Sequence, residues 1–145
     1  MRRWALAGGR EVHTTITRGH CLCGRVSFEY EGPASWCGHC HCESCRRNTS
    51  SPFTTWLGVS TSACRFTGET PKVYLSSSGV RRLFCGHCGT PMAFESARWP
   101  DETHFYAASL ENPRDFAPQF HVHCAEQLPW IKLDDGLPRH ERNAS

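Results

Sequence analysis

Long apolar runs are absent from this sequence. No stretch of about 18 or more apolar residues occurs, so we expect no transmembrane helix and no membrane partner. Arg2 and Arg3 are followed by only a few apolar residues before Gly8, too few for the apolar core of a signal peptide. We therefore expect a cytoplasmic protein.

Long helical periodicity is also missing, and the sequence shows no internal repeat, coiled coil or low-complexity linker. Short alternating segments separated by Gly, Pro, Ser, Asn and Asp instead predict a mostly antiparallel β fold. A chain of 145 residues is typical of a single domain. The predicted strands cover residues 26–30, 53–57, 72–75, 82–84, 92–94 and 104–108, with two more at 119–124 and 130–133, and one helical turn at 42–47.

A strong charge of either sign is missing as well. The chain has 16 Lys and Arg against 14 Asp and Glu, a formal charge of +2. Counting seven cysteines as thiolates and two Zn²⁺ ions brings the charge to about −1. The sequence therefore lacks the basic face that a nucleic-acid partner requires, which argues against such a partner.

Cysteine, by contrast, is abundant. Four of the ten cysteines lie in residues 37–45, where the spacing is Cys40-x-Cys42-x-x-Cys45. Two further pairs, Cys21-x-Cys23 and Cys85-x-x-Cys88, stand apart. Disulfides are the alternative, but such close spacing is common in metal sites and no export signal precedes them.

The two separate pairs together supply four thiolates, which is the ligand set of a closed, structural zinc site. Glycines flank both pairs and allow the sharp turns that bring backbone close to a metal. The alternative is four buried core cysteines. A closed site would stabilise a fold made of short strands.

The group Cys40, Cys42 and Cys45 supplies three thiolates and predicts an open zinc site with one exchangeable position. A thiol bound there loses its proton, so the site suits catalysis. The competing interpretation is a second structural site, closed by Cys37, His39 or His41. Cys64 and Cys124 remain, as core residues or as reactive thiols.

The ordered motifs resemble the glutathione-dependent formaldehyde-activating enzyme family, which also includes centromere protein V. The resemblance covers residues 13–141. It implies a β-tent fold, several coiled β-sheets around zinc, as a single domain. From the sequence itself we expect a loose extension at 1–12 before this domain and a frayed tail at 142–145 after it. The resemblance rests on Gly19-His-Cys-Leu-Cys-Gly24, Cys40-His-Cys-Glu-Ser-Cys-Arg-Arg47, Phe84-Cys-Gly-His-Cys-Gly-Thr90, Leu128-Pro-Trp130 and Asp135-Gly-Leu-Pro138.

The resemblance implies S-(hydroxymethyl)glutathione synthase activity, a carbon–sulfur lyase reaction between a small thiol such as glutathione and formaldehyde. It implies two zinc ions per chain. Asn48-Thr-Ser50 replaces a small Ala-Ser-Gly-like stretch of many relatives, which leaves the preferred thiol open. By position, the structural ligands are Cys21, Cys23, Cys85 and Cys88, and the catalytic ligands are Cys40, Cys42 and Cys45.

Glutathione carries two carboxylates, so guanidinium partners are expected in its site. Arg46 and Arg47 follow the three-cysteine motif directly and are the predicted substrate-binding residues. Arg81 and Arg82 precede Cys85, and for this pair a solvent-exposed position is the stronger interpretation.

Two rival functions remain. One is a non-catalytic zinc module that binds a protein or nucleic acid, as in the centromere protein V branch. The other is an enzyme like methionine sulfoxide reductase, which would need Cys124 or Cys64 as a free nucleophile.

Overall fold

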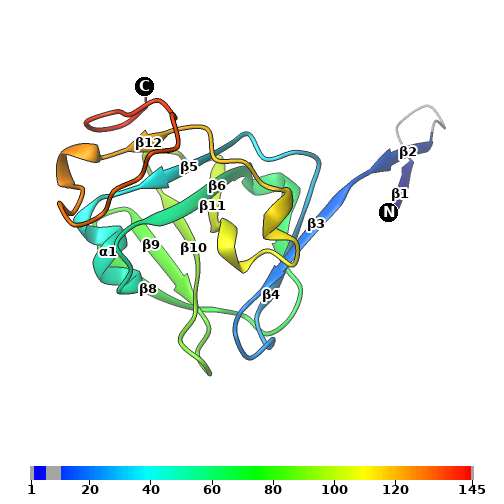
Figure 1. Cartoon of the computed structure of the whole chain (residues 1–145). Helices are drawn as coiled ribbons and strands as arrows, with labels where there is room; N and C mark the ends of the chain where they lie inside the picture. Colours follow the sequence, from blue (N-terminus) through cyan, green and yellow to red (C-terminus); the bar gives the residue numbers. More distant parts are fainter. Residues whose placement is uncertain (1, 6–10, 145) are drawn as a thin grey trace.

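A seven-stranded sheet forms most of the structure (Figure 1). The computed structural model describes residues 2–5 and 11–144. All neighbouring strands of this sheet are antiparallel except β12 and β5, which form a parallel pair at one edge. In spatial order the strands are β12 (His121–Val122), β5 (Trp36–Cys40), β6 (Thr54–Ser60), β11 (Glu102–Tyr106), β10 (Pro91–Ser96), β9 (Val80–Phe84) and β8 (Lys72–Ser77).

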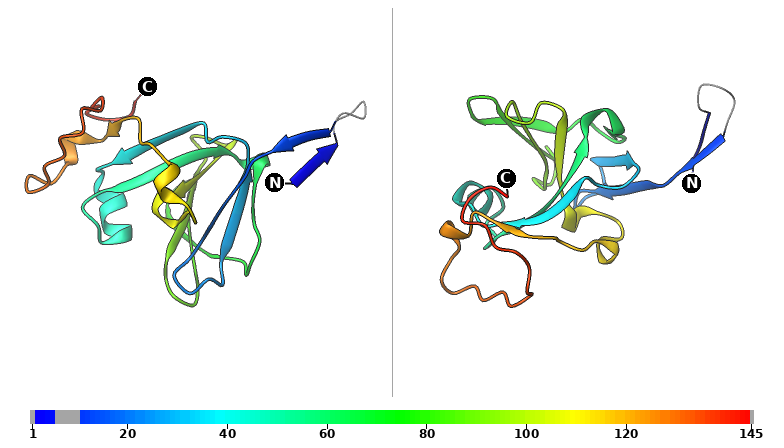
Figure 2. Two further views of the ribbon diagram at one scale, coloured as in Figure 1. Left: turned by 45° about the vertical axis from the view of Figure 1, so that its right-hand side comes forward. Right: turned by 90° about the horizontal axis from the view of Figure 1, so that it is seen from above.

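A three-stranded antiparallel sheet contains β3 (Ile16–His20), β4 (Ser27–Glu31) and β7 (Cys64–Phe66). A two-stranded ribbon, β1 (Arg2–Ala5) and β2 (Glu11–Thr14), precedes it. The ribbon projects away from the rest of the molecule in all views (Figure 2). Residues 1 and 6–10 of the predicted N-terminal extension, and residue 145 of the predicted tail, lie outside the described part of the chain.

Helices are short. The helix α1 (Glu43–Thr49) follows β5 almost directly and ends at Ser50, whose φ of 56° is left-handed. Four short 3₁₀ helices complete the described elements: η1 (Thr61–Ala63), η2 (Ala107–Ser109), η3 (Pro113–Asp115) and η4 (Cys124–Glu126). Within the described ranges, no helix has the length and apolar character that crossing a membrane requires.

The main core fills the space between the two larger sheets. Phe28 of β4 and Phe105 of β11 stack with ring centroids 4.1 Å apart and planes 8° apart, and neither ring is exposed. Gly19 on β3 faces the Phe28 ring so closely that an added Cβ would lie 2.4 Å from it. A side chain at position 19 would therefore push the two sheets apart.

The mostly β, single-domain fold built of several sheets is confirmed. The strands predicted between residues 26 and 106 are present with shifted ends. The strand predicted at 130–133 is wrong, because Ile131 N–H donates to the Leu128 carbonyl in a turn (3.1 Å) and this segment follows no sheet edge. At 119–124 only His121–Val122 is a strand. The sequence analysis missed β3 and β5, and also β1 and β2, which lie largely in the segment expected to be a loose extension.

We expect Phe105→Ala to lower the free energy of unfolding by about 3–5 kcal/mol, because it removes a fully buried ring and leaves a cavity between the sheets. Chemical denaturation measures the change. The control is Tyr74→Ala on β8, whose side chain is mostly exposed, with an expected change below about 1 kcal/mol. Equal effects at the two positions would contradict this view of the core.

Candidate metal centres and the cavity beside them

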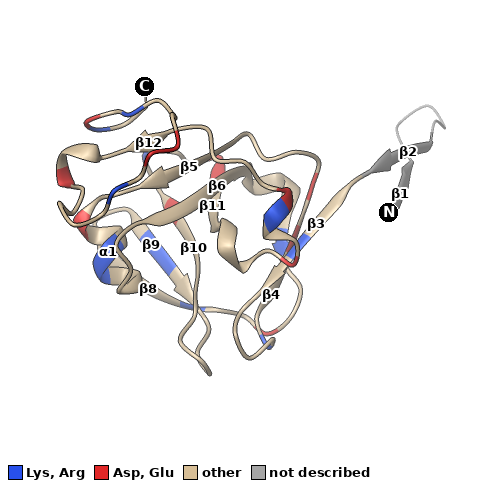
Figure 3. Ribbon diagram, viewed as in Figure 1, with Lys and Arg blue, Asp and Glu red and all other residues tan. Residues whose placement is uncertain are grey.

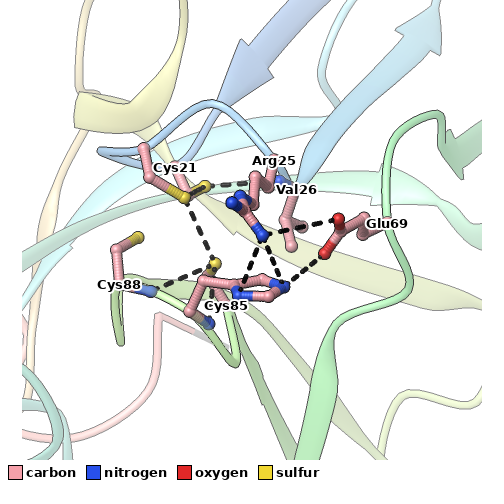
Figure 4. Close-up of polar contacts among 8 residues, drawn as sticks. Cys21, Arg25, Val26, Glu69, Cys85 and Cys88 are labelled. Atoms are coloured by element: carbon pink, nitrogen blue, oxygen red, sulfur yellow. Dashed lines mark hydrogen bonds and ion pairs between the residues drawn. The ribbon is translucent and has the colours of Figure 1, made fainter.

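Two turns from different sheets meet at a cluster of four thiols. Cys21 and Cys23 lie in the turn between β3 and β4, and Cys85 and Cys88 lie in the turn between β9 and β10. The four Sγ atoms all lie within 4.8 Å of one another. Figure 4 shows Cys21, Cys85 and Cys88 pointing toward a common centre.

The spacing of these thiols fits a tetrahedral zinc ion. The Sγ atoms of Cys21 and Cys23 are 3.6 Å apart, and those of Cys23 and Cys85 are 3.8 Å apart. A tetrahedral ion with Zn–S bonds of about 2.3 Å separates its sulfurs by about 3.8 Å. Backbone N–H groups of Val26 and His87 also point at the sulfurs of Cys21 (3.3 Å) and Cys85 (3.4 Å). Such donors stabilise thiolates.

Polar contacts around this cluster also favour the thiolate form of its cysteines. The Thr90 hydroxyl lies 3.1 Å from the Cys88 Sγ, and hydrogen bonds from the Thr90 side chain and backbone lower the pKa of Cys88 to about 5. Beside the thiols, Arg25 Nη1 is 3.2 Å from the His87 ring, and His87 Nε2 is 2.6 Å from a Glu69 carboxylate oxygen (Figure 4). In addition to the cysteine cluster, these contacts connect the β3–β4 turn to the β9–β10 turn.

The second cluster lies at the junction of β5 and α1. Cys40 ends β5, Cys42 is the N-cap of α1, and Cys45 lies in its first turn. Cys45 N–H donates to the Cys42 Sγ (3.3 Å), and the Sγ atoms of Cys45 and Cys40 are 3.7 Å apart. One short strand–helix connection therefore brings three thiols within 4.8 Å of one another.

The three thiols share their protons. Hydrogen bonds from Cys40, and then from Cys42, lower the pKa of Cys45 to about 2, whereas its neighbours raise the pKa of Cys40. Hydrogen bonding within the cluster thus favours thiolate character at Cys45 over Cys40. Its sulfur spacing matches that of the four-thiol cluster, so it could hold a metal ion of the same kind.

No fourth ligand joins the three thiols among the described residues. Cys37 is buried in the main core, where burial raises its pKa to about 11. His39 Nδ1 lies 2.8 Å from the Thr55 hydroxyl, and His41 Nε2 lies 2.9 Å from His121 Nδ1. None of the three residues considered as a closing ligand is grouped with the three thiols, although His41 Nδ1 is buried without a hydrogen-bond partner.

A cavity of about 1140 Å³ opens beside the three thiols, and Cys40, Cys42 and Cys45 form part of its wall. Aromatic side chains from three strands line much of the remainder, among them Trp36, Trp56 and Phe94. The three thiols thus face a space large enough for a substrate, whereas the four-thiol cluster is packed against the core.

A buried histidine pair lies behind β5, and the sequence analysis did not find it. His41 and His121 are fully buried, and His121 Nε2 is 2.8 Å from an Asp135 carboxylate oxygen. Burial, followed by the charge of His121, lowers the pKa of His41 to about 4. The chain of hydrogen bonds attaches the segment around Asp135 to β5. His39, His121 and Asp135 also form a third group that could hold a metal.

The two substrate-binding residues predicted from the sequence, Arg46 and Arg47, differ in their position relative to the cavity. Arg47 lines the cavity and its Nε lies 2.8 Å from Glu43, whereas Arg46 is not among the lining residues and its Nε donates to the His41 carbonyl (3.4 Å). Substrate contact by either residue stays a prediction. Asn48, where this chain departs from many relatives, also lines the cavity.

The two cysteines left over by the motifs lie outside both clusters. Burial raises the pKa of Cys64, whose Sγ donates to the Thr61 carbonyl (3.5 Å), so its thiol is a poor nucleophile. Cys124 begins a short 3₁₀ helix and is not among the residues that line the cavity.

Residues 16–126 match the sequence model of the glutathione-dependent formaldehyde-activating enzyme. The chain belongs to this family. The matched segment contains both cysteine clusters and most of the cavity wall.

Individual relatives agree with the assignment to this family. A Schizosaccharomyces pombe protein named as an uncharacterised lyase is 39% identical over 80 residues, which are 52% of this chain and 55% of the yeast protein. This chain therefore matches about half the length of that relative. A Halomonas elongata protein, provisionally named a glutathione-dependent formaldehyde-activating enzyme, is 22% identical over 82% of both chains.

The fold also has a solved counterpart. A crystal structure of a Rhodobacter sphaeroides protein superimposes with a TM-score of 0.56 and 26% sequence identity, over 68% of this chain and 93% of that chain. The sheet architecture is thus shared with another protein of known structure.

We expect Cys88→Ser to unfold much of the protein and to remove tightly bound zinc. Structural zinc sites contribute on the order of 10 kcal/mol, which is comparable to the whole stability of a domain, about 5–15 kcal/mol. Circular dichroism and metal analysis measure the outcome. Cys124→Ser is the matched control, because Cys124 lies in neither cluster. A folded Cys88→Ser protein with unchanged zinc content would contradict the structural role.

Proposed function

We propose that this protein is a zinc-dependent carbon–sulfur lyase of the S-(hydroxymethyl)glutathione synthase type, with two zinc ions per chain. It joins a small thiol, glutathione in the first instance, to formaldehyde or a related small aldehyde. The single observation that carries the proposal is the group of three thiols, with no fourth ligand among the described residues, in the wall of a large cavity.

The donor sets suggest different roles for the two clusters. Four thiols complete the coordination of a zinc ion, whereas three leave one position exchangeable. When bound at Cys40, Cys42 and Cys45, zinc would supply that position and acidify a thiol entering it. The family and the names of its relatives support a lyase acting on these substrates.

The cavity wall supplies the surroundings that the reaction needs. Trp56 is buried and packs with the thiol cluster, and Phe94 lies 5.8 Å from it, ring to ring. These rings exclude water around the reacting sulfur and strengthen electrostatic interactions there. A small aldehyde then reaches the sulfur in competition with little water.

Proton transfer requires a group beside the sulfur. The thiol loses its proton as the C–S bond forms, and the carbonyl oxygen gains one as it becomes a hydroxyl. We assign this transfer to His123, which lines the cavity, follows the strand residue paired with Cys40 and lies 3.4 Å from Glu126. Its left-handed φ of 54° is uncommon for a residue other than glycine, and such conformations cluster at functional sites.

The test of the proposed activity is turnover with and without the open cluster. We expect the zinc-loaded protein to accelerate formation of S-hydroxymethylglutathione from glutathione and ¹³C-formaldehyde, as followed by NMR. Cys42→Ser should stay folded, lose one zinc ion and return the rate to the uncatalysed value. If the protein without Cys42 retains full acceleration, or if it unfolds, the proposed division between the clusters is wrong.

We expect His123→Gln to lower kcat by about 100-fold with little change in KM, because general acid–base catalysis contributes about 10²–10⁴-fold. Steady-state kinetics at neutral pH measure both constants. His87→Gln is the control, since His87 lies at the four-thiol cluster and is not among the cavity-lining residues. An unchanged kcat in His123→Gln would remove this residue from the mechanism.

A further inference from the structure

Arg82 is a buried cation in the wall of the cavity. It lies on β9, only 8% of its surface is exposed, and it lines the same cavity as the three thiols. Its neighbour Arg81 is exposed and lies 3.3 Å from a carboxylate oxygen of Glu95. The alternation of side chains along the strand therefore places one arginine in solvent and the other in the cavity.

The polar contacts of Arg82 leave its charge unbalanced. Nε donates to the Ser76 hydroxyl (3.1 Å), and the guanidinium carbon lies 5.1 Å from the centre of the Phe94 ring. Nη1 is buried and has no hydrogen-bond partner. Within residues 2–5 and 11–144, no Asp or Glu forms an ion pair with it. Figure 3 shows the basic residues of β9 in blue.

Such an arrangement is unfavourable in an empty cavity. An arginine side chain stays protonated in proteins, so burial cannot be relieved by loss of the proton. A buried charge without a partner is costly, and so is a buried N–H group without an acceptor. An anion from solution that entered the cavity would satisfy both at once.

Packing connects Arg82 to the thiols. Burial raises the pKa of Tyr106, and the nearby charge of Arg82 opposes that rise. The Tyr106 ring lies 4.0 Å from that of Trp56. Trp56 in turn contacts Cys45. Arg82 and the three cysteines also line one cavity, so one molecule bound there could contact both.

We propose that Arg82 is the receptor for a carboxylate group of the thiol substrate. This inference deepens the proposed function and rests on it for the identity of the reacting group. The ligand class is a thiol that also carries a carboxylate, as glutathione does. One guanidinium balances one carboxylate in charge, whereas a phosphate dianion would keep one charge unpaired. The planar fork of Arg82 also matches the two oxygens of a carboxylate.

The rival explanation is that Arg82 only balances the negative charge of the thiol cluster. The two explanations differ in which measured property depends on Arg82. A carboxylate receptor affects the binding of acids but not of neutral analogues, whereas a counter-charge affects metal content and stability for every ligand.

The experiment compares 3-mercaptopropionate with its methyl ester, each titrated into zinc-loaded protein by calorimetry. We expect the wild-type protein to bind the acid more tightly than the ester. Arg82→Gln should weaken binding of the acid by about 10- to 100-fold and change binding of the ester by less than about 3-fold. Arg82→Lys keeps the positive charge but not the planar fork, so its affinity for the acid should fall by about 10-fold. This variant tests the proposal if Arg82→Gln fails to fold.

Arg81→Gln is the matched control, because Arg81 is the adjacent residue and its side chain is exposed. It should change binding of neither ligand. Equal weakening of acid and ester, no weakening, a fall in zinc content in Arg82→Gln, or wild-type protein that binds neither ligand would overturn the proposal. Turnover of glutathione and formaldehyde is measured on the same samples. Absent turnover with an Arg82-dependent preference for the acid contradicts the lyase proposal alone.

Discussion

The meeting of two turns, one from each of the larger sheets, is the constraint on which the rest of the structure depends. The β3–β4 turn brings Cys21 and Cys23 against Cys85 and Cys88 of the β9–β10 turn. Short strands bury limited apolar area, so a metal ion held at this junction would contribute much to the fixed relative position of the sheets. The stacked rings of Phe28 and Phe105 then pack in the space that the junction defines.

Much of this could be read from the sequence, because cysteine spacing is a local signal with a specific chemical meaning. Cys-x-Cys and Cys-x-x-Cys pairs with flanking glycines predict a turn around a metal ion. Each such turn supplies only two of the four ligands of a closed site, so one turn implies a second turn that supplies the other two. Gly24 and Gly89 do take left-handed φ values of 81° and 79°. The three-cysteine motif likewise forms at one strand–helix junction, so its geometry needs no distant residue.

The cavity could not be read in the same way, because its wall comes from strands that are far apart in the chain. Phe94 and Trp56 look like ordinary alternating strand residues, and only the sheet order brings them together. The contact between His41 and His121 depends on the parallel pairing of β12 with β5, a strand that the sequence analysis missed. Without that pairing, Asp135 had no predicted partner.

The pair Arg81 and Arg82 shows how the two parts of the structure depend on each other. The segment Val80–Phe84 lacks a clean alternation, so the sequence does not tell which arginine faces inward. The register of β9 decides it, and β9 runs directly into Cys85 of the four-thiol cluster, whose turn is closed by a 2.9 Å hydrogen bond from Cys85 N–H to the Thr90 carbonyl. A slip of one residue would exchange the two faces of the strand. β9 thus runs from the cavity beside the three-thiol cluster directly into the four-thiol cluster, and its register decides which guanidinium reaches that cavity.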